Sequence, residues 1–282
     1  MANTNSGYQV EVKKAFSQIE QGVKSVFESE NYKNYLKTMS KFHRYSVNNS
    51  LLIMLQHPDA TMVTGASKWN SMGRKIKRGS KAIKILIPHP YIREIETTNE
   101  DGETTMVEQQ FCYFTLGNVF DVSQTEGEEL PGICKELDDN SPLILSLIDK
   151  VSSVSSCPIS YWNLKEGSKG FYSTKDNKIV IRKDMSTSQT LKTLVHEIAH
   201  SRLHSDTDKS RQQCEIEAES IAFVVCNHFN VDTSNYSFEY IANWSRNKDA
   251  KELKGILTNI QKEVKKFIED IENVSIDEKE AV

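Results

Sequence analysis

The sequence predicts an α+β fold organised as two domains. At 282 residues the chain is too long for one small domain and suits two of ordinary size. Residues 81–122 contain β-branched and partly alternating runs, whereas residues 187–272 place apolar side chains at helical spacing. Between these regions, near residues 123–141, the composition becomes acidic and turn-rich. We therefore expect a mixed first domain, and a C-terminal domain that is mainly helical with a small edge hairpin.

The acidic stretch marks the boundary between the domains. It contains Pro131-Gly132 and the run Asp138-Asp139-Asn140, which are typical of chain outside regular structure. The polar start of the chain is expected to be disordered. We divide the chain into a disordered N-terminus at 1–8, a first domain at 9–127, a linker at 128–141 and a second domain at 142–282.

In the first domain, helical patterns precede strand patterns. Residues 9–39 lack proline and repeat apolar side chains at helical spacing, and a second helix is expected at 48–56, before His57-Pro58. Trp69 to Arg78 is predicted to be a short helix or turn. The run 81–88 is predicted to be a strand, and residues 91–97 and 107–116 to form a hairpin.

The second domain is predicted to open with a helix near 142–152. A hairpin is expected to pair 170–172 with 178–181 across Asp176-Asn177. Three helices follow, at about 187–205, 212–229 and 251–272. The strand 178–181 directly precedes the first of them. It is either an edge strand that can hold an extended peptide or a purely structural hairpin, and the sequence does not decide between these.

Composition excludes several classes of protein. No run of about 18 apolar residues is present, and the start of the chain lacks an apolar signal-peptide core. We expect a cytoplasmic protein with no membrane partner. The five cysteines form no CxxC pair and are odd in number, which argues against a disulfide framework and against a cysteine zinc finger.

Charge is distributed very unevenly along the chain. Between Lys33 and Pro90 there are eleven lysines and arginines but one acid, Asp59, so this segment carries +10 although the whole chain carries −4. Such asymmetry predicts a polyanionic partner for the basic half of the chain. The alternative is that these lysines and arginines form a solubilising surface. Aromatic residues inside the segment could stack on bases or belong to the core. The expected DNA-binding residues are Lys41, Arg44, Tyr45, Lys68, Trp69, Arg74, Lys75, Lys77, Arg78 and Lys81.

The run HEIAH, from His196 to His200, is the most specific motif. Positions i and i+4 share one face of a helix, so both histidines can bind one ion, and Glu197 lies beside them where it can take a proton from a water molecule. Residues 186–189 resemble a capping box, and the apolar run before the motif suits burial, which disfavours a chance match. We predict a zinc site with His196 and His200 as ligands and Glu197 as general base.

A catalytic zinc needs a third protein ligand. Downstream, Glu215 and Glu219 share a helix face with the small residues Ala218 and Ala222. We predict Glu215 as the ligand and Glu219 as the acid that orients a ligating histidine; the reverse assignment stays open. Glu217 is expected to face solvent. For His204, both a place in the cleft and a plain surface position remain open, and Tyr172 and His204 are the candidates for stabilising an oxyanion.

Two family resemblances follow from these motifs. The stretch Thr193 to His200, followed by Glu215-x-x-Ala218-Glu219-x-x-Ala222, resembles the ImmA/IrrE class of zinc metallopeptidases, which implies Glu215 as third ligand. The chain departs from that class in carrying Glu219 where many members have Asn. Residues 8–127 resemble the N-terminal domain of ArdC-type antirestriction proteins, through 48–53, Trp69, 76–83 and 119–125. That resemblance implies single-stranded DNA binding on a mobile or conjugative genetic element.

Together these patterns predict a zinc-dependent metallopeptidase, a hydrolase of the HExxH type, with an N-terminal single-stranded DNA-binding domain. Its partners would be single-stranded DNA and a protein or peptide substrate. The competing hypothesis is a non-catalytic antirestriction or DNA-binding accessory protein in which zinc is structural. Glu197 favours catalysis, because a structural site does not need it.

Overall fold

The computed structural model describes residues 3–98, 104–130, 141–232 and 236–275. The expected hairpin tip and most of the expected linker lie outside these residues. Helices and strands are both abundant, which confirms the α+β class. The chain forms two compact units, one made of residues 1–22 and 51–128 and the other of 23–50 and 129–282. The first unit is therefore not the continuous segment 9–127 that we expected.

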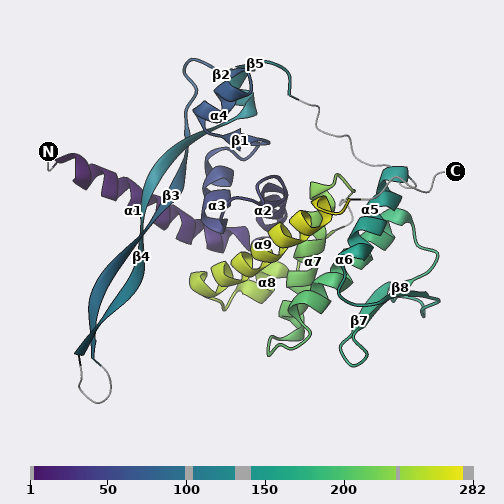
Figure 1. Ribbon diagram of the computed structural model, residues 1–282. Coiled ribbons are helices and arrows are strands. Elements are labelled where there is room, and N and C mark those ends of the chain that lie inside the picture. Colours follow the sequence, from purple (N-terminus) through teal and green to yellow (C-terminus); the bar gives the residue numbers. More distant parts are fainter. Residues whose placement is uncertain (1–2, 99–103, 131–140, 233–235, 276–282) are drawn as a thin grey trace. The chain divides into compact units, whose positions relative to one another are not determined.

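The first unit is built around a long two-stranded ribbon. Strands β3 and β4 pair in antiparallel register from Ile83 opposite Val119 to Thr98 opposite Thr104 (Figure 1). Strand β1 pairs with the end of β4, and β2 pairs with β5 in a separate small sheet. The elements are α1 (Asn3–Val26), α3 (Val47–Gln56), β1 (Val63–Thr64), α4 (Ala66–Ser71), β2 (Arg74–Ile76), β3 (Ile83–Thr98), β4 (Thr104–Asp121), the 3₁₀ turn η1 (Val122–Gln124) and β5 (Thr125–Gly127). The last turn of α1, 23–26, and the first turn of α3, 47–50, belong to the second unit.

Helix α1 begins at Asn3, inside the segment 1–8 that we expected to be disordered. The amphipathic part after residue 8 supplies the nucleus, and adding turns to an existing helix costs little compared with starting one. The predicted helix 9–39 is instead two helices, α1 and α2 (Ser29–Lys41). The chain turns between them at Phe27, whose buried ring lies 5.2 Å from that of Tyr32.

A capping box at Asp121 organises the turn after β4. The Asp121 carboxylate accepts a hydrogen bond from Ser123 N–H, and Gln124 Oε1 accepts one from Asp121 N–H. Gln124 also holds the turn at residues 77–81. Its side-chain amide N–H donates to Lys81 O, and its backbone carbonyl accepts from Lys77 N–H. We call residues 77–81 the basic turn. Gly79 lies within it at φ +86°, a conformation that residues with a Cβ adopt at a cost.

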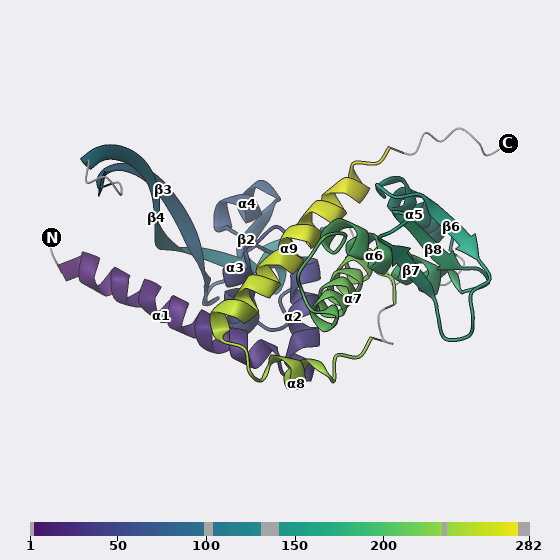
Figure 2. The same ribbon diagram turned by 90° about the horizontal axis from the view of Figure 1, so that it is seen from below.

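The second unit packs a bundle of helices beside a three-stranded sheet (Figure 2). Helices α6 and α7 pack against each other, α9 packs on α7, and α6 also contacts α5, β7 and β8. The elements are α2, α5 (Pro142–Ser153), β6 (Ile159–Trp162), β7 (Gly170–Ser173), β8 (Lys178–Arg182), α6 (Thr187–Leu203), α7 (Arg211–His228), α8 (Ile241–Ser245) and α9 (Ala250–Glu272).

The sheet order is β6-β8-β7, with β6 parallel and β7 antiparallel to β8. The strand that we considered as a possible edge, 178–181, is therefore central and cannot accept another strand. Its second neighbour is β6, which the sequence analysis did not predict. The strand next to α6 with a free side is β7.

Helix α2 belongs to the second unit because its partners lie there. Tyr32 and Ser220 of α7 share a buried hydrogen bond of 2.7 Å between their hydroxyl oxygens, and Tyr35 and Leu36 are fully buried.

No helix in the described part of the chain combines the length and apolarity that a membrane span requires.

Candidate metal centre

Helices α6 and α7 carry the candidate centre, and each begins at a serine cap. Ser186 Oγ accepts a hydrogen bond from Gln189 N–H, and Ser210 Oγ accepts one from Gln213 N–H. Such caps satisfy backbone donors that a helix start leaves unpaired. They set where each helix begins, and the packing of α6 on α7 brings the HEIAH face of α6 toward the start of α7.

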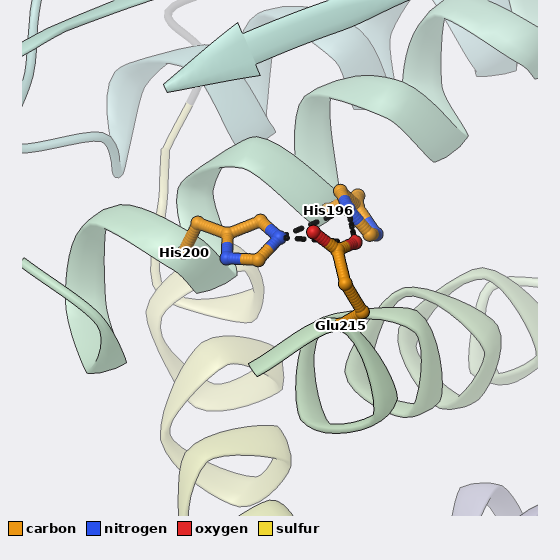
Figure 3. A group of neighbouring side chains, drawn as sticks. All are labelled: His196, His200 and Glu215. Atoms are coloured by element: carbon orange, nitrogen blue, oxygen red, sulfur yellow. Dashed lines mark hydrogen bonds and ion pairs between the residues drawn. The ribbon is translucent and has the colours of Figure 1, made fainter. Parts of the chain in front are cut away.

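Three side chains converge between these helices (Figure 3). His196 Nε2 and His200 Nε2 lie 3.1 Å apart. Glu215 Oε2 lies 3.5 Å from His196 Nε2 and 3.7 Å from His200 Nε2. Each residue offers one ligand atom, and these three atoms all lie within 4.8 Å of one another. Two imidazole nitrogens and a carboxylate oxygen form a donor set that fits a divalent metal, and this set is one that catalytic zinc uses.

Glu219 lies behind the first histidine. Its Oε2 is 3.2 Å from His196 Nδ1, on the side of the ring away from the donor cluster, although the two atoms do not form a hydrogen bond. The structure thus places Glu215 among the donors and Glu219 where it can orient a ligating ring. The two roles remain predictions.

The charges at the centre are strongly coupled. Burial alone would lower the pKa of His196, but Glu215 and Glu219 outweigh it and raise this pKa to about 10. The neighbouring imidazoles of His196 and His200 hold the pKa of Glu215 far below its usual range. Because a histidine must be neutral to bind a metal, metal binding at His196 has to displace a proton.

Glu197 is buried beside the donor cluster. Burial raises the pKa of its carboxyl, and the nearby His196 and His200 oppose that rise. The backbone N–H of Tyr172 in β7 donates to the carboxylate and holds it in place. A carboxyl group with a raised pKa accepts a proton more readily than an ordinary glutamate.

His204 and Glu217 form a buried network behind the second histidine. His200 Nδ1 lies 3.0 Å from His204 Nδ1, and His204 Nε2 lies 3.1 Å from Glu217 Oε2. Glu217 is fully buried and also accepts hydrogen bonds from Lys209 (2.7 Å) and Gln213 (2.9 Å). Our prediction that Glu217 faces solvent was therefore wrong. It was made from the helix face alone, whereas the partners that bury Glu217 come from the end of α6 and from the loop before α7.

Two cavities lie on either side of Glu197. One, of about 330 Å³, is lined by the loop 167–170 and by the α6 face that includes Lys192 and Thr193. The other, of about 680 Å³, is lined by β7 and by the metal-binding face. Gly170, the first residue of β7, allows the strand to lie close against α6, since a Cβ there would lie 2.7 Å from Thr193 Cγ2. The Tyr172 hydroxyl donates to Asn177 Oδ1 at 3.0 Å, so it is not a free oxyanion donor as first considered.

The basic residues divide between the two units. Lys68, Arg74, Lys75, Lys77, Arg78 and Lys81 lie in the first unit, whereas Lys41, Arg44 and Tyr45 lie in the second. Arg44 pairs with Glu272 at 3.4 Å. Trp69 is fully buried, and its indole N–H donates to Phe120 O at 2.9 Å, so the prediction that Trp69 contacts DNA was wrong. Its hydrogen bond and its packing on the end of β4 make it a core residue.

Comparison with known proteins identifies the class of the N-terminal part. Residues 8–120 match the family model described as the N-terminal domain of anti-restriction factor ArdC. This confirms the resemblance predicted for that region. The comparisons do not test the resemblance of the second domain to ImmA/IrrE peptidases, which stays a prediction.

The chain is also similar to one curated protein and to two solved structures. The protein pXO2-81 of Bacillus anthracis, described as uncharacterized, is 26% identical over 277 residues, which cover 83% of this chain and 46% of that protein. The chain thus spans about half the length of this curated relative. The metal-free crystal structure of antirestriction protein ArdC from plasmid R388 gives a TM-score of 0.49 at 18% identity, covering 82% of this chain and 86% of that one. Its Mn(II)-bound form gives 0.48 at 13% identity, covering 82% and 90%.

Proposed function

We propose that the protein is a DNA-binding protein of the antirestriction type, and that its first unit binds single-stranded DNA. The match of residues 8–120 to the ArdC N-terminal domain carries this proposal. The surface chemistry supports it. Lys75, Arg78 and Lys81 are exposed, and no ion pair engages them within the part of the chain that the structure describes. Unpaired exposed cations are available to neutralise phosphates.

The basic turn is suited to contact a nucleic-acid backbone. Its hydrogen bonds to Gln124 fix its shape before any ligand binds, and Lys77 Nζ is itself held on Ser123 O at 2.9 Å. A preorganised turn loses less conformational entropy on binding than a mobile one. Gly79 adds backbone without a side chain at its exposed tip, where phosphate oxygens can approach closely.

Salt dependence tests this proposal. Binding of a fluorescent single-stranded oligonucleotide is measured by anisotropy across a salt series for the native chain and for a triple variant, Lys75→Gln, Arg78→Gln and Lys81→Gln. Three lost phosphate contacts would reduce the slope of log affinity against log salt by about 2, at about 0.7 per contact. The control removes three exposed lysines of α9, Lys262→Gln, Lys265→Gln and Lys266→Gln. An unchanged slope in the first variant contradicts the proposal.

A specific observation favours a second function, metal-dependent hydrolysis of peptide bonds. The observation is Glu197, buried beside the donor cluster with a raised pKa and bordering both cavities. A metal that served only structure would not need such a group. His196, His200 and Glu215 would hold a divalent cation, for which Zn²⁺ is our candidate. When bound, the cation would supply Lewis acidity toward a water molecule and a carbonyl group.

The residues of the chain would perform the remaining steps. Glu197 takes a proton from the attacking water and returns it to the departing amine. Tyr172 N–H holds Glu197 in position for both transfers. Glu219 faces His196, and the pair His204 and Glu217 faces His200, so each imidazole keeps its Nε2 toward the centre. Strand β7 has a free edge beside α6, along which an extended peptide would lie.

Metal analysis and one conservative variant test the second function. Purified protein reconstituted with Zn²⁺ or Mn²⁺ should contain about one ion per chain, and His196→Ala should abolish this. Glu197→Gln should retain the metal, and we expect it to lose proteolysis by at least about 100-fold, a typical contribution of general base catalysis. If Glu197→Gln keeps every effect of the native protein in cells while it binds metal, then the protein acts without hydrolysis. No ion bound after reconstitution would refute the centre itself.

A further inference from the structure

Lys192 is a buried cation next to the candidate centre. It lies on α6 one helical turn before His196, and its side chain is only 7% exposed. Its ammonium lies 5.6 Å from the centre of the Tyr236 ring, a weak cation–π contact. Among the residues that the structure describes, no carboxylate forms an ion pair with it. A buried ammonium without a counter-ion is costly and therefore indicates a missing anionic partner.

This ammonium borders the 330 Å³ cavity, which reaches the donor cluster at its other end. Gln189, Lys192, Thr193 and His196 follow one another at helical spacing and form one face of α6 along it. Lys169, from the loop opposite, donates to Gln189 Oε1 at 3.0 Å and brings a second cation to the same wall. The cavity thus has two lysines, of which neither is paired with an acid in the described structure.

The two acids that also line the cavity are engaged elsewhere. Glu219 faces His196 Nδ1, and Glu197 accepts the Tyr172 N–H and serves the reacting centre. Lys192 is about 6 Å along the helix axis from His196, which is four residues at about 1.5 Å each. A group bound at Lys192 would therefore be separated from the reacting centre by roughly the length of one amino-acid side chain.

We propose that this cavity is a substrate subsite that binds a carboxylate through Lys192. The proposal rests on the hydrolytic function proposed above and adds a specificity to it. Two sources carry this chemistry, the side chain of an aspartate or glutamate and the C-terminal carboxylate of a peptide. Lys192 recognises the shared carboxylate, and Lys169 and Gln189 form the polar wall beside it.

Binding of a matched pair of probes tests the subsite without any need for turnover. The probes are glutaric acid monohydroxamate, whose hydroxamate binds the metal and whose carboxylate reaches toward Lys192, and the corresponding terminal amide. Calorimetry on the metal-loaded protein should show the acid bound about 10- to 100-fold more tightly, the range of one charge-assisted hydrogen bond. Lys192→Met should remove this preference, and Lys192→Arg should retain much of it. Lys183→Met, at an exposed site outside the cavity, is the control.

Equal affinity of the native protein for the two probes, or binding of neither, overturns the proposal, even where Lys192→Met does not fold. Two peptide mixtures then identify the source of the carboxylate. One holds peptides with internal acids and amidated ends, and the other holds acid-free peptides with free C-termini. If the hydrolytic function is wrong, both mixtures stay intact while the acid probe is still preferred. If the subsite is wrong, cleavage occurs with no dependence on carboxylates.

Discussion

Substitution of Asp121 is expected to lower the free energy of unfolding of the first unit. Its carboxylate is 1% exposed and accepts hydrogen bonds from the backbone N–H groups of Thr61 (2.7 Å), Met62 (3.0 Å) and Ser123 (2.9 Å). Hydrogen bonds to a charged acceptor contribute about 1.5–3 kcal/mol each. We expect Asp121→Ala to lower the free energy of unfolding by about 3–5 kcal/mol, less than the sum because water would enter the space left behind. Asp121→Asn should cost about 1.5–3 kcal/mol, since its amide keeps one acceptor oxygen but sets a donor against an N–H group.

Tryptophan fluorescence can isolate the first unit in this test. Trp69 is its one tryptophan, so urea unfolding is followed in a background of Trp162→Phe and Trp244→Phe. Asp59→Ala, at an exposed acid in the same unit, is the control and should change stability by less than about 0.5 kcal/mol. A loss below about 1 kcal/mol for Asp121→Ala would refute the reasoning, because it would mean that the three N–H groups find other partners.

The pKa of Asp121 also predicts how the stability of the first unit depends on pH. Burial would raise the pKa of Asp121, but hydrogen bonds from Ser123, Thr61 and Met62 outweigh it and hold the pKa below the ordinary value of 3.8. A carboxyl whose pKa is depressed on folding contributes stability above its unfolded pKa, and this contribution is lost as the pH falls through the folded pKa. The stability difference between the native chain and Asp121→Asn should therefore shrink below about pH 4 and be constant above pH 5.

Three further predictions concern the second unit. Glu219→Ala should weaken Zn²⁺ binding by about 10- to 100-fold, measured by competition with a chelating dye, and Glu215→Ala should weaken it more. The opposite order would exchange the roles assigned to the two glutamates. Gly170→Ala should cost about 1–3 kcal/mol in urea unfolding, because its Cβ would meet Thr193 Cγ2 at 2.7 Å and Val180 O at 3.0 Å; a neutral result would show that β7 moves freely. Glu217→Ala should cost about 3 kcal/mol by the same measurement, since it leaves the buried His204 and the part-buried Lys209 and Gln213 without the acceptor that they share. The control Glu269→Ala, at a half-exposed site, should cost under about 0.5 kcal/mol.

Local patterns predicted most of the elements and the centre of the site. The cap at Ser186, the apolar spacing of α9 and the hairpin of β7 and β8 each depend on a few neighbouring residues, and each element formed close to its expected bounds. The approach of His196 to His200 follows from helix geometry alone. The approach of Glu215 to both required only that two helices with small facing residues pack together.

The features that were missed depend on contacts between distant parts of the chain. Strand β6 is a short run whose parallel partner lies about twenty residues later, so no turn signal identifies it. Glu217 carries an ordinary surface charge in sequence, and its burial needs Lys209 and His204 to arrive from elsewhere. Trp69 lies among lysines, and only the fold shows that the end of β4 covers it. Composition predicts that a basic surface exists but not which of its aromatic neighbours remain on it.

The division of the chain into interleaved units has a consequence for its synthesis and dissection. Because α2 lies on α7, the aromatic and aliphatic face of α2 has no cover until the ribosome has produced residues nearly 200 positions later. The intervening residues 51–128 can complete their own contacts first, so α2 is made before these residues but finds its place after them. A fragment cut at residue 128 would leave Tyr32, Tyr35 and Leu36 in water, and expression of the proposed DNA-binding region by itself calls for polar replacements at these three positions.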